Sequence, residues 1–162
     1  MSYEAVLPIW RVVRDRFQKM VESLKEEELH MAMSPESATI AHMIRHNAEV
    51  EYMFADWFFG RSAPEDITYM ASGKTDSYDP EAFTLGAVIA FSAAADTYFT
   101  EAMSVLPSDL WDVEITSKIG PSTPREALGR AIYHTGIHAG QIALIRKHAP
   151  LAAAAIKQTI IQ

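Results

Sequence analysis

Cysteine is absent from this sequence of 162 residues. Without cysteine the chain forms no disulfide bond, holds no metal ion through a thiolate and has no cysteine nucleophile. Any sulfur nucleophile in its chemistry must therefore come from another molecule. A chain without disulfides suits a reducing compartment, and we expect a cytoplasmic protein.

Long apolar runs are missing as well. No uninterrupted apolar segment reaches the roughly 18 residues of a membrane span, and no basic start followed by an apolar run indicates a signal peptide. Basic charge is scarce, because 14 Lys and Arg stand against 21 Asp and Glu, a formal net charge of −7. This negative field opposes binding to phosphate backbones. We therefore expect a small-molecule substrate, with no membrane and no nucleic acid as partner.

The remaining composition is that of an ordinary globular protein, with 49% hydrophobic and 22% charged residues. A chain of this length buries roughly 70% of the surface that its unfolded form exposes, so one core is enough to hold it. We predict a single domain over residues 1–162.

Helical periodicity dominates the chain. Apolar residues recur at spacings of three and four in four segments, which are 3–27, from 35 or 37 to 59, 80–105 and from 124 to about 148. Pro150 predicts a separate short helix over 151–161. The connections 60–79 and 107–123 are long enough to join parallel neighbours. The pattern predicts an all-α fold, a four-helix bundle with long crossover connections and a short C-terminal helix.

Local signals mark where these helices begin and end. Start signals with a capping residue and a proline occur at 34–37, at 79–81 and at 123–126, where Thr123 and Glu126 fit a capping box. Gly60 predicts the end of the second helix. In the connection that follows the third helix, residues 111–115 alternate apolar and polar side chains, which favours a short strand.

Two histidines of the fourth helix carry the clearest chemical signal. His134 and His138 are four residues apart, so they share one helix face and can reach one metal ion. Gln141 points nearly the same way as His134. A third ligand is expected from a facing helix of the bundle, and the second helix offers both His42 and His46. Imidazole nitrogens suit first-row divalent ions.

Two carboxylates of the second helix lie near these histidines. Glu49 follows His46 by three residues and could hydrogen-bond a ligand imidazole or a bound water. For Glu51 we expect a solvated helix face. For His42 a partly exposed position near the helix start is the better interpretation, and a fourth ligand is the alternative.

The segment 44–51, Ile-Arg-His-Asn-Ala-Glu-Val-Glu, resembles the second-helix motif of the DinB-like superfamily of damage-inducible four-helix-bundle proteins. The segment 134–142, His-Thr-Gly-Ile-His-Ala-Gly-Gln-Ile, resembles its more specific fourth-helix motif. The resemblance covers nearly the whole chain. It implies that His46, His134 and His138 bind one divalent metal ion, most often zinc or nickel, and that the protein forms a homodimer.

The resemblance also suggests an activity. Relatives include transferases that use low-molecular-weight thiols such as bacillithiol or mycothiol, a glutathione-dependent isomerase and hydrolases. The expectation is a metal-dependent thiol S-transferase or hydrolase for small molecules, with a possible thiol cosubstrate. Glu49 or Gln141 would orient the bound water or substrate. Tyr52, Tyr133 and Trp57 are candidates for the pocket wall, and aromatic core is the favoured interpretation of these three side chains. The alternatives are a non-catalytic bundle that binds a metal or ligand, and a purely structural dimer.

Two features of the helices favour a homodimer. Met53, Trp57, Phe58 and Phe59 crowd the end of the second helix, more than one helix can bury within a single bundle. Glycines 136 and 140 cost helix stability but allow another helix to approach closely.

Overall fold

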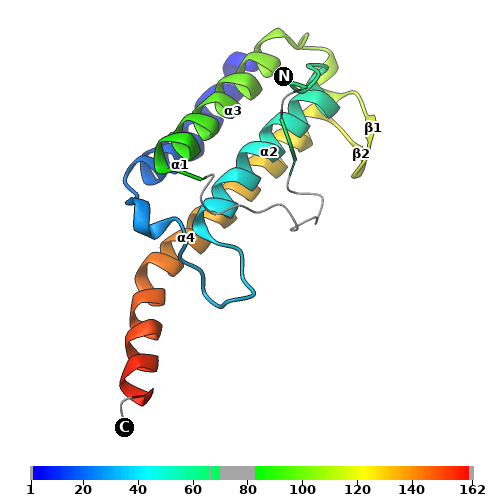
Figure 1. The fold of residues 1–162 in the computed structure, drawn as a ribbon. Coiled ribbons are helices and arrows are strands. Elements are labelled where there is room, and N and C mark those ends of the chain that lie inside the picture. Colours follow the sequence, from blue (N-terminus) through cyan, green and yellow to red (C-terminus); the bar gives the residue numbers. More distant parts are fainter. Residues whose placement is uncertain (1, 66, 70–82, 161–162) are drawn as a thin grey trace.

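A computed structural model of the chain describes residues 2–65, 67–69 and 83–160, with side chains described as far as residue 149. The elements in chain order are α1 (Tyr3–Glu22), η1 (Glu26–Glu28), α2 (Ile40–Phe59), α3 (Leu85–Val105), η4 (Leu110–Asp112), β1 (Ile115–Ser117), β2 (Gly120–Ser122) and α4 (Pro124–Ile160). The four α-helices pack against one another as a bundle (Figure 1). This confirms the predicted all-α fold.

Helices α2 and α3 lie side by side and run in the same direction (Figure 1). Near the start of α2, the guanidinium of Arg45 lies 4.1 Å from the ring centroid of Phe91, in the first half of α3. Just after the end of α2, Arg61 donates to Glu101, near the end of α3. Parallel neighbours need a long crossover between them, as the length of the connection predicted. Residues 70–82 of that connection lie outside the described part.

The predicted start of α2 at Pro35 or Ser37 is wrong, because a better cap lies further on. The side chain of Thr39 accepts a hydrogen bond from the backbone N–H of His42 at 3.2 Å, so the helix begins at Ile40. Residues 34–37 form a turn instead, closed by a bond from the Ser37 N–H to the Ser34 carbonyl. A serine followed by proline is a signal for turns as much as for helices.

Other boundaries also differ from the predictions. Helix α1 ends at Glu22 rather than near residue 27, because the following acidic run forms the separate turn η1. Helix α3 begins after its cap Thr84, whose side chain accepts from the N–H of Ala87. The predicted start of α3 at residues 79–82 falls outside the described residues.

The connection after α3 forms a small antiparallel hairpin. The predicted strand over 111–115 is wrong, since 110–112 form a 3₁₀ turn and the strand is Ile115–Ser117, paired with Gly120–Ser122. Gly120 has φ = 96°, a left-handed value that other residues rarely adopt.

Helix α4 begins as predicted. Thr123 and Glu126 exchange side-chain and backbone hydrogen bonds in a capping box, and Pro124 is the first helical residue. The predicted end near residue 148 and the predicted separate helix over 151–161 are both wrong, because α4 continues through Pro150 to Ile160 as one helix. The alanines at 152–155 have the highest helix propensity and favour continuation beyond the proline.

Three apolar clusters fill the described interior. The smallest consists of Ala48, Tyr52 and Ala95, and the two larger ones lie toward the two ends of the bundle. One is rich in aromatic side chains and contains Val6, Trp10, Phe54, Phe58, Phe59, Phe99, Met103, Trp111 and Leu128. The other is mainly aliphatic and contains Phe17, Val21, Leu24, Leu29, Ile40, Ile44, Val88, Ile142 and Ile145. Between them lies a layer of buried polar side chains, Arg14, Asn47, Glu51, Ser92 and Thr135. We call it the polar layer.

The chain itself buries part of the crowded end of α2. Phe58 and Phe59 are only 1% and 4% exposed, because they pack into the aromatic cluster. Met53 and Trp57 are half-buried beside them. The bundle therefore buries two of these four side chains and leaves Met53 and Trp57 partly exposed. Within the described chain, no helix combines the length and hydropathy that crossing a bilayer requires.

Candidate metal centre

Three histidines converge beside the polar layer. His46 comes from α2, and His134 and His138 come from successive turns of α4. The Nε2 atom of His134 lies 3.1 Å from Nε2 of His46 and 3.2 Å from Nε2 of His138. One ring nitrogen from each residue lies within 4.8 Å of the other two, and the described residues form no other such cluster.

Gln141 sets the proton position on His138. Its amide oxygen lies 2.8 Å from Nδ1 of that ring. An amide oxygen only accepts hydrogen bonds, so Nδ1 carries the proton and Nε2 presents a lone pair toward the cluster. Gln141 therefore orients a histidine, one turn of helix after it.

Asn47 does the same for His134. Its side-chain oxygen lies 3.3 Å from Nδ1 of His134 and also accepts from the hydroxyl of Thr135 at 3.1 Å. Nδ1 of His134 is then the donor, and its Nε2 lone pair also faces the cluster. Two rings on one helix thus direct their lone pairs to the same place.

Burial keeps these imidazoles neutral. Burial first, and then the nearby rings of His138 and His46, lower the pKa of His134 to about 4. The pKa values of His46 and His138 are lowered as well, again chiefly by burial. At neutral pH all three rings are therefore in the form that binds metal ions.

The donor set fits a divalent ion. Converging lone pairs repel one another unless a cation lies between them. Two imidazoles on a tetrahedral zinc ion, with Zn–N bonds of about 2.0–2.1 Å, would place their nitrogens about 3.3 Å apart. The observed separations of 3.1 and 3.2 Å are close to that value. Three neutral nitrogen ligands leave at least one position for another molecule.

An open cavity of about 470 Å³ reaches His46. Its other walls are Met53, Asp56, Trp57, Ala63, Tyr69 and Lys118. They come from α2, from the segment after it and from the hairpin turn. Burial raises the pKa of Tyr69 to about 12, so its hydroxyl stays protonated. Volume and lining are those of a small-molecule site. Of the three aromatic candidates for the wall, Trp57 lines this cavity, whereas Tyr52 is buried beside Phe91 and Tyr98, and Tyr133 is 71% exposed.

A second cavity of about 340 Å³ reaches Gln141, the partner of His138. Its walls also include Met33, Ser37, Met43, Leu144 and His148, from the other half of the bundle. One cavity thus reaches a histidine of the cluster, and the other reaches the side chain that bonds to a second one.

The two carboxylates are both buried. Glu49 is fully buried and accepts from Nε of Arg45 at 2.9 Å. Glu51 is 1% exposed and accepts from Nε of Arg14 at 2.8 Å, so the expectation of a solvated face is wrong. Burial raises the pKa of Glu51 to about 7, against the opposing effect of Arg14.

The expectations for His42 and for the two glycines of α4 can also be compared with the structure. His42 is half-buried on α2 and lies outside the cluster of possible ligands. A Cβ added at Gly136 or Gly140 meets no described atom within 4 Å. Among the described residues, no other helix therefore lies close to these two glycines.

Sequence reasoning missed Arg14 and Asn47. A charged side chain such as Arg14 is expected on an exposed face, yet α1 buries it together with Val6, Trp10, Phe17 and Val21. Their spacing of three and four residues is a detectable signal, because a charged residue inside such a series needs a buried partner.

Comparisons with known proteins agree with the fold. The sequence matches the mycothiol-S-transferase family over residues 9–149. The structure resembles that of a DinB-like protein from Bacillus cereus, with a TM-score of 0.71 and 19% identity over 91% of this chain and 92% of that one. A DinB-like protein from Bacillus subtilis gives a TM-score of 0.66 and 14% identity, over 88% and 90%.

A third similar structure is a mycothiol-dependent maleylpyruvate isomerase, with a TM-score of 0.66 and 16% identity. The similarity covers 88% of this chain and 61% of the isomerase. No curated protein matched the sequence. At these identities the structural similarities establish the fold alone.

Proposed function

Because the chain belongs to the mycothiol-S-transferase family of DinB-like proteins, we propose that it is a metal-dependent enzyme that transfers a low-molecular-weight thiol to an electrophilic small molecule. The observation that carries the proposal is the cluster of three neutral imidazoles beside an open cavity. A chain without cysteine needs an external thiol for sulfur chemistry. Such a thiol stays reduced in the cytoplasm, where we place the reaction.

His46, His134 and His138 would hold one divalent ion, zinc or nickel, through nitrogen ligands at about 2.0–2.2 Å. When bound, the ion supplies a Lewis acid that favours the ionised form of a thiol or water. Gln141 holds the ring of His138. Glu49 is proposed to orient the thiol or water, which is supported by its charge acting on His46 from within the buried face of α2.

The cavity at His46 would receive the electrophile. Trp57 and Tyr69 provide aromatic surface, and Lys118 provides a positive charge at its edge. During a substitution, the sulfur–carbon bond forms while the bond to the leaving group breaks, and the thiol proton passes to solvent. Binding both reactants next to each other would raise the rate of the reaction through proximity.

The direct test begins with protein purified without a nickel column. We expect mass spectrometry to find about one zinc or nickel ion per chain. We expect mycothiol to conjugate to monochlorobimane faster with the enzyme than without it, and faster than bacillithiol or glutathione does. Bound metal without thiol consumption would indicate the non-catalytic binding protein. Ester cleavage in the absence of thiol would indicate the hydrolase.

We also propose a homodimer formed through α4. Its outer face carries exposed apolar side chains, with Tyr133 71%, Ile137 38% and Leu144 55% exposed. Gly136 and Gly140 on the same helix leave open space in which a helix of a second copy could approach. Light scattering at micromolar concentration should give twice the mass of the chain, and Ile137→Glu should reduce it. A monomeric wild-type protein would contradict this proposal.

A further inference from the structure

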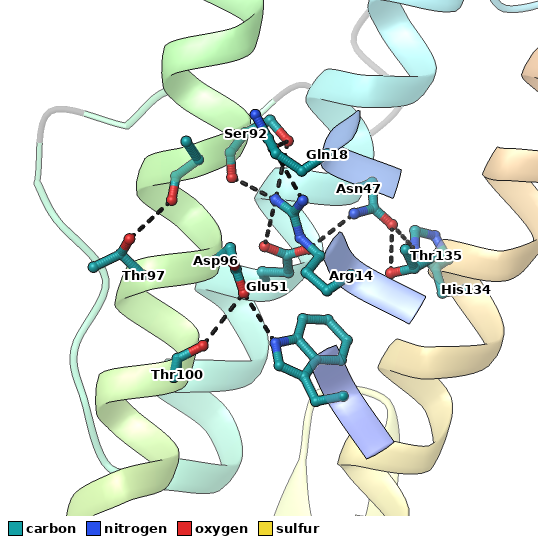
Figure 2. A network of polar contacts seen from close by, with 12 residues as sticks. Arg14, Gln18, Asn47, Glu51, Ser92, Asp96, Thr97, Thr100, His134 and Thr135 are labelled. Atoms are coloured by element: carbon teal, nitrogen blue, oxygen red, sulfur yellow. Dashed lines mark hydrogen bonds and ion pairs between the residues drawn. The ribbon is translucent and has the colours of Figure 1, made fainter. Parts of the chain in front are cut away.

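A chain of buried hydrogen bonds crosses the bundle and ends at the histidine cluster (Figure 2). It begins on α1 with Arg14, which is 0% exposed. The Arg14 guanidinium donates to the carbonyl and the hydroxyl of Ser92 on α3, and to Gln18 on its own helix. It also donates to both carboxylate oxygens of Glu51 on α2, at 2.8 and 3.4 Å. Arg14 therefore connects α1 to both α2 and α3 through hydrogen bonds.

When Glu51 is ionised, the next link has only one direction. Oε1 of Glu51 accepts from Arg14 and also from the side-chain amide of Asn47, at 2.9 Å. The nitrogen of the Asn47 side chain therefore faces Glu51, and its oxygen must face the other way, toward α4. A reversed amide would place its oxygen against the oxygen of Glu51 and lose both contacts.

The last link reaches the cluster. The Asn47 oxygen meets the hydroxyl of Thr135 and Nδ1 of His134 (Figure 2). Both Asn47 and Thr135 are 1% exposed, so water does not replace these contacts easily. The orientation of one buried amide thus decides which nitrogen of His134 carries the proton.

We infer that Asn47 is a positioning residue that holds His134 in the Nδ1–H tautomer, with its Nε2 lone pair directed at the metal ion. The Arg14–Glu51 pair sets the orientation of Asn47. This inference rests on the metal site proposed above. It assigns the polar layer a role in metal affinity in addition to packing. Packing alone does not require a polar layer, since well-packed apolar residues often replace a buried ion pair without loss of stability.

Two substitutions at Asn47 separate positioning from packing. Asn47→Leu has similar size but no acceptor, so His134 is free to change tautomer. Asn47→Asp keeps an acceptor for His134 but places a carboxylate against Glu51, which should lower the melting temperature. We expect Asn47→Leu to bind zinc 10–100-fold more weakly than wild type, about the effect of losing such a hydrogen bond. Asn47→Asp should bind within a few-fold of wild type.

The measurements are zinc affinity by competition with a chromogenic chelator, melting temperature, and ¹⁵N NMR of the His134 ring in the metal-free protein. The spectrum should show the Nδ1–H tautomer in wild type and a mixture in Asn47→Leu. Asn47→Ala, which is too small to clash, is measured in parallel and should show the same loss of affinity. Ser92→Ala is the control, since it removes hydrogen bonds at the far end of the network. It should lower the melting temperature without changing zinc affinity.

Wild-type zinc affinity in both Asn47→Leu and Asn47→Ala would overturn the positioning role and leave the proposed function standing. An Nε2–H tautomer in the wild-type protein would overturn it as well. A wild-type protein that binds no divalent ion would overturn the proposed function, and the positioning role with it.

Discussion

The aromatic end of the bundle and the polar layer are built from the same helices, but they constrain their residues differently. At the aromatic end, rings meet edge to face, as Phe99 does with Trp10 and with Phe59, both at 5.3 Å between centroids. Such contacts are stabilised by area and shape and have no required donor or acceptor. In the polar layer each group needs one particular partner. The aromatic end therefore provides stability, whereas the polar layer fixes how α2 and α4 face each other.

The largest effect on stability is expected at the aromatic end. Phe99→Ala removes a fully buried ring and should lower the unfolding free energy by about 3–5 kcal/mol. Urea unfolding measures the loss. Val105→Ala on the same helix, at a position 73% exposed, is the control and should change little. The folded fraction of Phe99→Ala should still bind one ion. Loss of metal binding in this variant would contradict the separate roles of the two regions.

Loss of the metal ion should have the next largest effect. His138→Ala should lose the ion and any activity while circular dichroism at 25 °C shows an intact bundle, because the apolar clusters do not depend on the ion. The variant lacks the stabilisation that a bound ion adds to the folded state, about 2.7 kcal/mol when free metal is at a hundredfold excess over its dissociation constant. His30→Ala, at an exposed position, is the control. An unfolded His138→Ala chain would show that the site is structural.

The polar layer should also give stability a dependence on pH. The pKa of Glu51 is raised from 4.5 to about 7 by burial, so between these values the folded state keeps a proton that the unfolded state has released. The contribution of this proton to the unfolding free energy is complete below pH 4.5. It decreases by about 1 kcal/mol per pH unit as the pH rises from 4.5 to about 7, and it does not change further above that.

Comparing metal-free wild type with Glu51→Gln isolates this contribution from that of the histidines. The difference in unfolding free energy between the two proteins should change across this window and be flat above it. Glu36→Gln, at an exposed position, should follow wild type throughout. A Glu51→Gln curve parallel to wild type would show that Glu51 does not titrate there.

The smallest effect on stability is expected for Glu49→Gln. The variant loses the charge that pairs with Arg45, which is itself 22% exposed, so the unfolding free energy should fall by only about 1 kcal/mol. Metal content should be unchanged. Turnover with thiol and electrophile should fall by about 10²-fold if Glu49 orients the nucleophile. Full activity would remove Glu49 from the mechanism and leave the histidines in place.

Local periodicity explains which features could be predicted from the sequence. His134 and His138 share a face because of helix geometry alone, and the capping box of α4 needs only residues 123–126. The bundle follows from the apolar spacing of its helices. His46 was matched to them through a family resemblance, and the structure places its ring nitrogen beside theirs. Metal binding by the three residues stays a prediction.

Features that depend on distant partners could not be predicted. Arg14 and Glu51 are 37 residues apart, and each alone suggests a solvated side chain. Only the folded bundle, in which α1 and α2 both pack against α3 and α4, brings them together. The start of α2 was missed because the turn at residues 34–37 and the cap at Thr39 carry similar signals. Helix α4 passes Pro150 although proline usually begins or ends a helix.

The walls of the cavity beside His46 have a consequence for how such a protein diversifies. Ala63 and Tyr69 lie in the segment after α2, and Lys118 lies in the turn of the hairpin, so none of them belongs to the helices that carry the histidines. Substitutions in connecting segments usually cost little stability. Selection, natural or in a library randomised at these positions, can therefore change the shape and charge of this cavity while the three histidines stay unchanged.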